Sequence, residues 1–170
     1  MKLASSRIII KPLSLEGLIQ INKQKQYIYE GIDLTGLLLT DIQRKAISIK
    51  INKMSKIPKE SHNWYTYWLI INKSSLEIMG LIGFKGIDDK GEAEIGYGIL
   101  KQYEGQGYMT EAVKTLIKWA FKNKSCKALT ATRVLKINYG SQKVLLKNGF
   151  KQVEENKETI NYRLVKNSTI

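Results

Sequence analysis

The residues best suited to chemistry lie in a turn at positions 102–110, with Gly105 and Gly107 at its centre. Residues 92–100 before it form a predicted strand, and apolar residues after it recur at helical spacing, at Met109, Ala112, Val113, Leu116, Ile117, Ala120 and Phe121. Such a turn leaves the first N–H groups of the helix without intrahelical partners, and glycine lets an anion approach them because it has no Cβ. Together with the positive end of the helix dipole, these groups predict a phosphate-binding turn.

The glycine spacing excludes two common phosphate loops. A Walker A loop ends in Gly-Lys followed by Ser or Thr, and the chain contains no such tripeptide. A dinucleotide fingerprint requires a third glycine where this chain has Thr110. The remaining pattern is Gln102-x-x-Gly105-x-Gly107.

The elements that must position this turn alternate along the chain. Strands are predicted at residues 7–13, 64–71, 76–87, 92–100, 128–134, 150–154 and 160–165. Helices are predicted from an N-cap at Ser14, over 41–53, after the turn, and over 138–148. The second of these has Ile42, Ala46, Ile49 and, just beyond it, Met54 at helical spacing. With no linker or repeat between them, these elements predict a single domain over residues 1–170.

Two longer runs make a resemblance to the GNAT acetyltransferases specific. The six-position pattern resembles the pyrophosphate signature of that family, which binds acetyl-coenzyme A. The runs around it resemble the branch containing ribosomal-protein N-terminal acetyltransferases and spermidine acetyltransferases; they are Ala93-Glu94-Ile95-Gly96-Tyr97, Gly105-Gln106-Gly107-Tyr108-Met109-Thr110-Glu111-Ala112 and the tail Asn138-x-x-Ser141 with Asn148-Gly149-Phe150. The resemblance covers nearly the whole chain. It implies an α/β (α+β) GNAT fold, with a mixed central sheet of about seven strands, four helices and a splayed cofactor cleft.

The resemblance also implies which residues contact acetyl-CoA. The backbone of the turn would hold the pyrophosphate, the strand edge before it would pair with the pantetheine arm, and the start of a later helix would flank the far side. The residues so implied are Tyr97, Gly98, Ile99, Lys101, Gln102, Glu104, Gly105, Gln106, Gly107, Tyr108, Met109, Thr110, Asn138 and Ser141. The alternative role of Asn138 is to cap its helix, and the alternative role of Gly98 is to relieve packing under a helix.

Acetyl transfer to an amine requires a base for the acceptor, donors for the oxyanion and an acid for the thiolate. Glu94 resembles the catalytic glutamate of histone-type members and is the predicted base; its alternative is an ordinary ion pair. Many members carry a tyrosine acid where this chain has Leu145, so Ser141, Tyr139 or water is expected to serve. The reserve candidates for the base are Glu111, Tyr97 and Ser141, and the alternative role of Glu111 is to complement the helix N-terminus.

The expected function is therefore transfer of an acetyl group from acetyl-CoA to a primary amine, by direct attack without a covalent enzyme intermediate. The acceptor is predicted to be a protein N-terminal amine. The alternatives are a small-molecule amine (a polyamine, an amino acid or an aminoglycoside) or a non-catalytic CoA-binding module. An aromatic group comprising Tyr27, Tyr29, Trp64, Tyr65 and Tyr67 is expected to pack in the core, with lining of the acceptor pocket as the alternative.

The net charge of +13 has two interpretations, a lysine-rich composition or attraction to anions. Of the 28 basic residues, four are arginines, and the lysines are scattered along the chain. This pattern favours the compositional interpretation and predicts no specific nucleic-acid partner, with RNA or ribosome association as the alternative.

The rarest residue types and the hydropathy exclude several further classes of site and partner. The single Cys126 and the single His62 exclude an internal disulfide framework and a histidine-rich metal site, so no metal is expected. No apolar run approaches the roughly 20 residues that span a bilayer, so no membrane partner is expected. The sequence predicts a cytoplasmic protein and leaves a homodimer open.

Overall fold

The computed structural model describes residues 1–23, 28–37 and 39–167. The described helices are α1 (Leu15–Lys23), α2 (Asp41–Met54), α3 (Tyr108–Lys122) and α4 (Tyr139–Lys147), with 3₁₀ helices at Lys59–Trp64 and Lys101–Tyr103. The main sheet contains β1 (Leu3–Ala4), β2 (Ile8–Pro12), β5 (Tyr67–Asn72), β6 (Ile78–Ile87), β7 (Glu92–Ile99), β8 (Ala128–Leu135), β9 (Lys151–Glu155) and β10 (Thr159–Val165). A separate small hairpin joins β3 (Ile28–Tyr29) to β4 (Ile32–Asp33).

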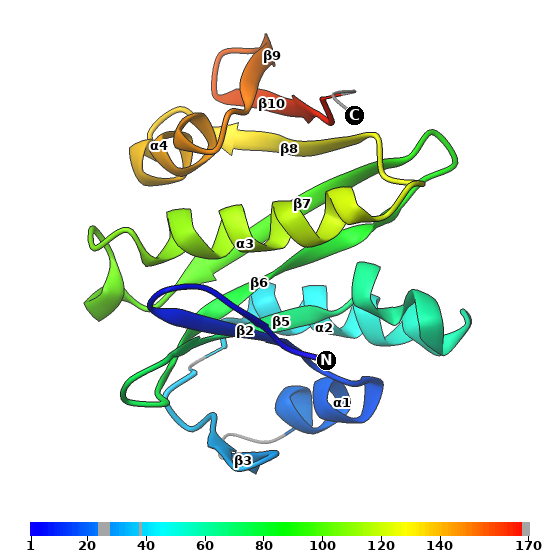
Figure 1. Cartoon of the computed structure of the whole chain (residues 1–170), viewed down its shortest axis with the longest axis vertical. Coiled ribbons are helices and arrows are strands. Elements are labelled where there is room, and N and C mark those ends of the chain that lie inside the picture. The colour runs from blue at the N-terminus through cyan, green and yellow to red at the C-terminus, as the bar shows by residue number, and fades with distance from the viewer. Residues whose placement is uncertain (24–27, 38, 168–170) are drawn as a thin grey trace.

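The main sheet is mixed and has eight strands in the order β1-β2-β5-β6-β7-β8-β10-β9. Neighbouring strands are antiparallel except for β7 and β8, which are parallel. Because α3 connects these two strands as a crossover, it lies across one face of the sheet (Figure 1). The predicted mixed α/β fold with four α-helices is confirmed, and the two-residue strand β1 brings the sheet to eight strands.

The parallel pair β7–β8 opens soon after it begins. Its ladder joins Glu92 to Ala128, Ala93 to Leu129 and Glu94 to Thr130, yet β7 continues to Ile99 and β8 to Leu135. Figure 1 shows the two strands diverging beyond the paired ends. The predicted splay is therefore confirmed, and it starts at Glu94.

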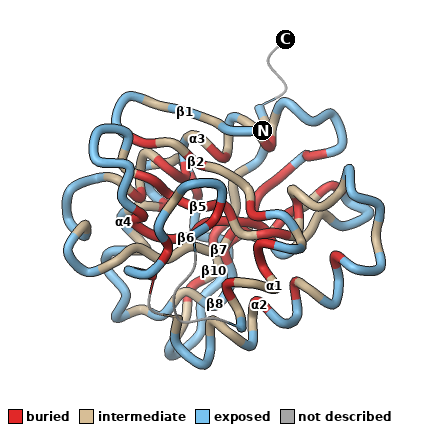
Figure 2. Tube along the Cα trace, turned by 90° about the horizontal axis from the view of Figure 1, so that it is seen from below, coloured by how far each residue is buried: buried red, intermediate tan, exposed pale blue. Residues whose placement is uncertain are grey.

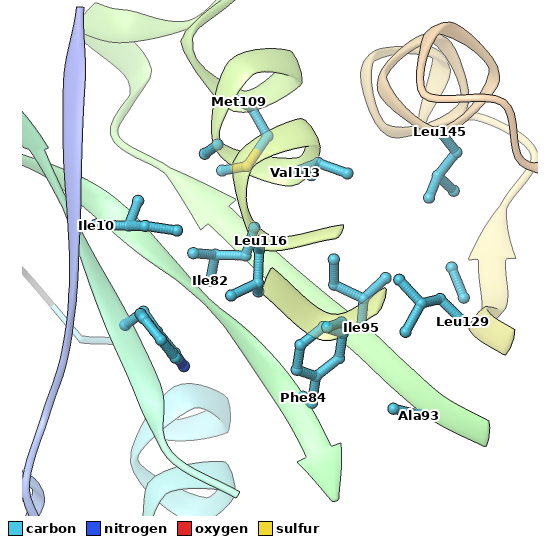
Figure 3. Close-up of a cluster of buried hydrophobic side chains, with 14 of the residues drawn as sticks. Ile10, Ile82, Phe84, Ala93, Ile95, Met109, Val113, Leu116, Leu129 and Leu145 are labelled. Carbon is cyan, nitrogen blue, oxygen red and sulfur yellow. The ribbon is translucent and has the colours of Figure 1, made fainter. Parts of the chain in front are cut away.

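Side-chain alternation divides the core into two layers, one on each face of the sheet. On the α3 side, Ile82, Phe84 and Ile95 pack with Met109 and Leu116 (Figure 3). The other layer lies between the opposite face of the sheet and the helices α1 and α2. It contains Leu18, Ile21, Ile47, Met54, Leu69, Ile71 and Leu81. Figure 2 shows the buried residues concentrated in the middle of the molecule, where the strands of the sheet lie.

The predicted apolar face of α2 is wrong at two positions. Ile42 and Ile49 are 81% and 60% exposed and Ile47 is buried instead, whereas Met54 is buried as its spacing predicts. The helix carries apolar residues on two faces, so the 3.6-residue period alone did not select the one that meets the sheet. The predicted cap of the first helix is confirmed, because the Ser14 hydroxyl accepts a hydrogen bond from the Gly17 N–H at 3.0 Å.

The strand predicted from residue 64 begins later, at Tyr67. Trp64 ends the 3₁₀ helix that follows Pro58, and its ring lies 5.2 Å from that of Phe84 and 4.7 Å from that of Trp119. Trp64 and Tyr29 are buried, which confirms their expected core packing. Tyr27 lies outside the described residues.

Candidate active site

The glycine turn has the backbone conformation that its sequence predicts. Gly105 and Gly107 have φ angles of +72° and +82°, in the left-handed region that glycine adopts without a Cβ penalty. Gly107 is the N-cap of α3, and the backbone N–H of Glu111 donates the first hydrogen bond of the helix to the Gly107 carbonyl at 3.1 Å. The N–H groups of the first turn therefore have no intrahelical acceptor, as phosphate binding requires.

A cavity of about 660 Å³ lies between this turn, β7 and α4. Its lining includes most of the residues predicted to contact the cofactor, namely Tyr97, Gly98, Ile99, Glu104, Gly105, Gly107, Met109, Thr110, Asn138 and Ser141. The volume lies within the roughly 300–1,000 Å³ range of small-molecule sites. The sheet's splay thus opens beside the glycine turn.

Four predicted contact residues lie outside that lining: Lys101, Gln102, Gln106 and Tyr108. Lys101 and Gln102 belong to the 3₁₀ helix before the turn. The Gln106 side chain donates from Nε2 to the Gln102 carbonyl at 2.9 Å, which closes the turn on itself. The Arg7 guanidinium lies over the Tyr108 ring, 4.4 Å from the centre of that ring. The Gln106 and Tyr108 side chains therefore contact the turn and Arg7 outside the cavity.

Sequence reasoning missed two lysines in the cleft, Lys143 and Lys147. Both belong to α4, and their spacing of four residues places them on one face of the helix. Two cations on the cleft-facing side of the helix after Asn138 were a usable signal, because an anionic ligand was already expected there.

Tyr97 and Ser141 meet across the cleft. The Tyr97 hydroxyl lies 3.0 Å from the Ser141 hydroxyl and donates to the Ser141 carbonyl at 3.3 Å. Burial raises the pKa of Tyr97 to about 12, although the bond to Ser141 acts in the opposite direction. Asn138 caps α4 by accepting the Ser141 N–H at 3.0 Å, and it also lines the cavity, so its two predicted roles coincide in position.

Glu94 lies on the other face of β7, as the alternation predicts. Its Oε1 accepts hydrogen bonds from Lys85 Nζ at 2.5 Å and from Thr132 Oγ1 at 2.7 Å. No hydrogen bond to Oε2 is found among the described residues, and the side chain is 25% exposed. The ion pair expected as the alternative is therefore present, and one carboxylate oxygen still faces outward.

A second cavity of about 330 Å³ borders Glu94. Its other lining residues are Lys53, Tyr65, Lys85, Gly86, Ile87, Asp88, Glu92 and Thr130. Glu94 is also the last residue of the β7–β8 ladder. The carboxylate thus lies where the sheet begins to open, between a cavity on its own face and the cleft along the rest of β7.

Two other predicted candidates are placed differently. Leu145 is fully buried and points into the core beneath α4, so that position offers no acid (Figure 3). The carboxylate of Glu111 is occupied by four donors from residues 5–7, which disfavours its reserve role as a base. Within the described ranges, no group of three or more His, Cys, Asp or Glu side chains could hold a metal ion, and no helix is long and apolar enough to cross a bilayer.

Comparison with known proteins agrees with this geometry. The family model described as an acetyltransferase (GNAT) domain matches residues 7–151. The uncharacterized N-acetyltransferase YjdG of Bacillus subtilis is 42% identical over 84 residues, which cover 49% of this chain and 49% of YjdG. The chain therefore matches about half the length of that curated relative.

Solved structures share the fold over almost the whole chain. The ribosomal-protein-S5-alanine acetyltransferase of Vibrio fischeri has a TM-score of 0.71 at 16% identity, covering 99% of this chain and 98% of that one. The ribosomal L7/L12 acetyltransferase RimL, in complex with coenzyme A, has a TM-score of 0.65 at 16% identity, covering 97% and 98%. The chain belongs to the GNAT family of acetyltransferases.

Proposed function

We propose that the protein is an acetyl-CoA-dependent N-acetyltransferase that acts on a primary amine by direct attack, without a covalent enzyme intermediate. The observation that carries this proposal is the course of β7. That strand bears Glu94 where the sheet opens, forms the open edge of the cleft at residues 97–99, and leads into the glycine turn. One element thus positions the base, the thioester and the pyrophosphate.

In this proposal, the first N–H groups of α3 and the cations of Lys143 and Lys147 bind the phosphates of acetyl-CoA. The pantetheine arm lies along Tyr97, Gly98 and Ile99, whose backbone faces the gap left by the splay. Gly98 keeps that edge free of a side chain. The solved RimL complex with coenzyme A shows that a protein of this fold binds the cofactor, which supports the assignment.

Glu94 would accept a proton from the acceptor ammonium, directly or through water, and Lys85 and Thr132 would hold its carboxylate in place. The amine nitrogen then forms a bond to the carbonyl carbon, and the carbon–sulfur bond breaks. Backbone N–H groups of β7 would stabilise the oxyanion. The departing thiolate would take a proton from Ser141 or from water, and that group would be reprotonated by the proton that the nitrogen loses as the amide forms.

For the acceptor we propose a protein N-terminal amine. Neighbours with this fold include acetyltransferases named for ribosomal proteins S5 and L7/L12. The net charge of +13 disfavours a polycation, because the field of the whole protein repels it. We further propose that residues 1–170 work as one domain in the cytoplasm, where the lone thiol of Cys126 stays reduced.

The test is release of free thiol from acetyl-CoA in the presence of peptides, polyamines and aminoglycosides, with calorimetry of coenzyme A binding alone. We expect coenzyme A binding and turnover on peptides with a free N-terminal amine. Turnover on a small amine alone would replace the proposed acceptor. Binding without turnover on any acceptor would favour a binding module, and absence of binding would overturn the whole proposal.

A further inference from the structure

The N-terminal strands reach the cofactor turn through one carboxylate. Glu111, in the first turns of α3, accepts hydrogen bonds at Oε1 from the Ser5 hydroxyl (2.7 Å), the Ser6 hydroxyl (3.0 Å) and the Arg7 N–H (2.9 Å). Its Oε2 accepts the Arg7 Nε–H at 2.8 Å. These donors stand more than 100 positions earlier in the sequence, between β1 and β2. One side chain therefore ties the start of the chain to the start of α3.

Arg7 continues this connection into the turn itself. Its Nη1 donates to the Gln106 carbonyl at 3.0 Å, and its guanidinium lies 4.4 Å from the ring centre of Tyr108. A Cβ added to Gly107 would lie 3.4 Å from Arg7 Nη2. The guanidinium thus contacts the residues on both sides of Gly107 and lies next to Gly107 itself.

The carboxylate of Glu111 is only 16% exposed, whereas Arg7 is 46% exposed. Partial burial acts to raise the pKa of Glu111, but the bonds from Ser5, Arg7 and Ser6 outweigh it and lower the pKa to about 2. The pair is therefore charged throughout the neutral range. A carboxylate this close to the N-terminus of α3 complements the helix dipole, but it would by itself also repel a phosphate bound there.

We propose that Glu111 is a positioning residue for the cofactor turn: it orients Arg7, and Arg7 fixes the Gln106 carbonyl and Gly107 so that the N–H groups of the turn face the pyrophosphate. This inference rests on the proposed binding of acetyl-CoA at that turn. Neither side chain lines the cleft, so the pair acts through the shape of the backbone. The Arg7 fork also offsets the negative charge of Glu111.

Two variants separate positioning from simple charge. If Glu111 acts only as a negative charge near the phosphates, Glu111→Gln tightens coenzyme A binding. If it positions the turn, Glu111→Gln weakens binding, and Arg7→Lys also weakens it because an ammonium keeps the charge but lacks the planar fork. We expect about a tenfold rise in the dissociation constant for each, the size expected for loss of charge-assisted hydrogen bonds.

The experiment is calorimetry of coenzyme A with the wild-type protein, Glu111→Gln, Arg7→Lys and the double variant, with urea unfolding to verify that each is folded. Because the two residues act as a unit, the dissociation constant of coenzyme A for the double variant is expected to be about the same as for either single variant. Glu155→Gln is the matched control; it removes a carboxylate paired with Lys136 at 3.0 Å and leaves coenzyme A binding unchanged.

Amide hydrogen exchange provides a readout that needs no cofactor. We expect faster exchange at residues 104–110 in Glu111→Gln, and no change there in Glu155→Gln. Unchanged or tighter coenzyme A binding in Glu111→Gln would overturn the inference while leaving the proposed function intact. Failure of the wild-type protein to bind coenzyme A would instead overturn the proposed function.

Discussion

The hydroxyl groups of Tyr97 and Ser141 lie 3.0 Å apart, so β7 and α4 meet across the opening that the splayed sheet creates. Because burial raises the pKa of Tyr97 to about 12, the phenol keeps its proton at neutral pH. It can therefore orient the Ser141 hydroxyl, which lines the cleft and which we propose as a proton donor to the thiolate.

Replacement of Ser141 should accordingly affect catalysis more than replacement of Tyr97. We expect Ser141→Ala to lower kcat roughly tenfold to a hundredfold, at the low end for general acid catalysis because a thiolate leaves readily. Tyr97→Phe keeps the ring and should lower kcat only a few-fold. The measurement is kcat at saturating acetyl-CoA and acceptor, and wild-type kcat in Ser141→Ala would assign the proton to water.

Glu94→Gln tests whether the protein is a catalyst or a binding module. The change removes the proposed base without altering the shape of the side chain, so we expect kcat/KM for the acceptor to fall by about 10²- to 10⁴-fold. Coenzyme A affinity should be unchanged, because Glu94 lies outside the lining of the cofactor cavity. The measurements are thiol release and calorimetry on the same preparation.

Thr132→Val is the companion variant. It removes one donor to Glu94 Oε1 and leaves the carboxylate and Lys85 in place. A smaller decrease in kcat/KM is therefore expected. Full activity of Glu94→Gln would rule out Glu94 as the base, and Glu92, which lines the same cavity, would be the next carboxylate to replace.

Gly105→Ala and Gly31→Ala form a matched pair. Both glycines have left-handed φ angles, +72° and +81°, and neither has an atom within 4 Å of an added Cβ. Each substitution should therefore cost a similar 1–2 kcal/mol or so of backbone strain. Only Gly105→Ala should also weaken coenzyme A binding, because Gly31 lies in the β3–β4 hairpin, away from the cleft lining.

Urea unfolding and calorimetry measure the two effects separately. Equal loss of stability with equal coenzyme A affinity in both variants would contradict the assignment of the turn to the pyrophosphate. Loss of affinity in Gly105→Ala alone would support it.

The conformation of the turn was predictable from sequence because it depends on local rules, whereas the splay was expected only from the resemblance to the family. Positive φ at Gly105 and Gly107 follows from residue type. The cap of Asn138 on α4 is also local, because its hydrogen bond joins residues three positions apart. The exposed Ile42 on α2 was not predictable, because two apolar faces competed and the sheet selected one. Local pattern specifies an element more reliably than it specifies which face the element buries.

Contacts distant in sequence were beyond the reach of the pattern. Arg7 and Glu111 are joined across 104 positions, and the fold alone brings them together. An ion pair was the expected alternative for Glu94, but the sequence could not name the partners of its carboxylate, and the structure identifies them as Lys85 and Thr132 on neighbouring strands. The supporting shell of the candidate site therefore had to come from the structure.

Lys50 on α2 gives a pH-dependent prediction. Its Nζ donates to the carbonyls of Phe84 (2.6 Å) and Tyr65 (3.0 Å), and it is one of the few buried polar side chains. Burial, together with the charges of Lys85 and Lys53, lowers the pKa of Lys50 to about 7. A neutral amine can donate both hydrogen bonds, so the folded protein favours the uncharged form.

The sign follows from proton binding. In the unfolded chain the pKa of Lys50 returns to its ordinary 10.5, so between pH 7 and 10.5 the unfolded state binds more protons than the folded state. This lysine's contribution to the free energy of unfolding should therefore rise with pH above 7 and be smallest below it, with a gain of about 2 kcal/mol between pH 7 and 9.

Urea unfolding at pH 7, 8 and 9 measures that slope, and Lys50→Met should remove it. Lys45→Met, on an exposed position of the same helix, is the control and should keep the wild-type slope. Comparing the slopes of variants cancels the contributions of other groups. One such group is Cys126: burial raises its pKa from the ordinary 9.0 to about 11, so its thiol titrates near pH 9 in the unfolded chain but not in the folded protein. An identical slope in Lys50→Met and in the wild-type protein would mean that Lys50 keeps its charge in the fold, held by the two carbonyls and by the Tyr67 ring 4.5 Å away.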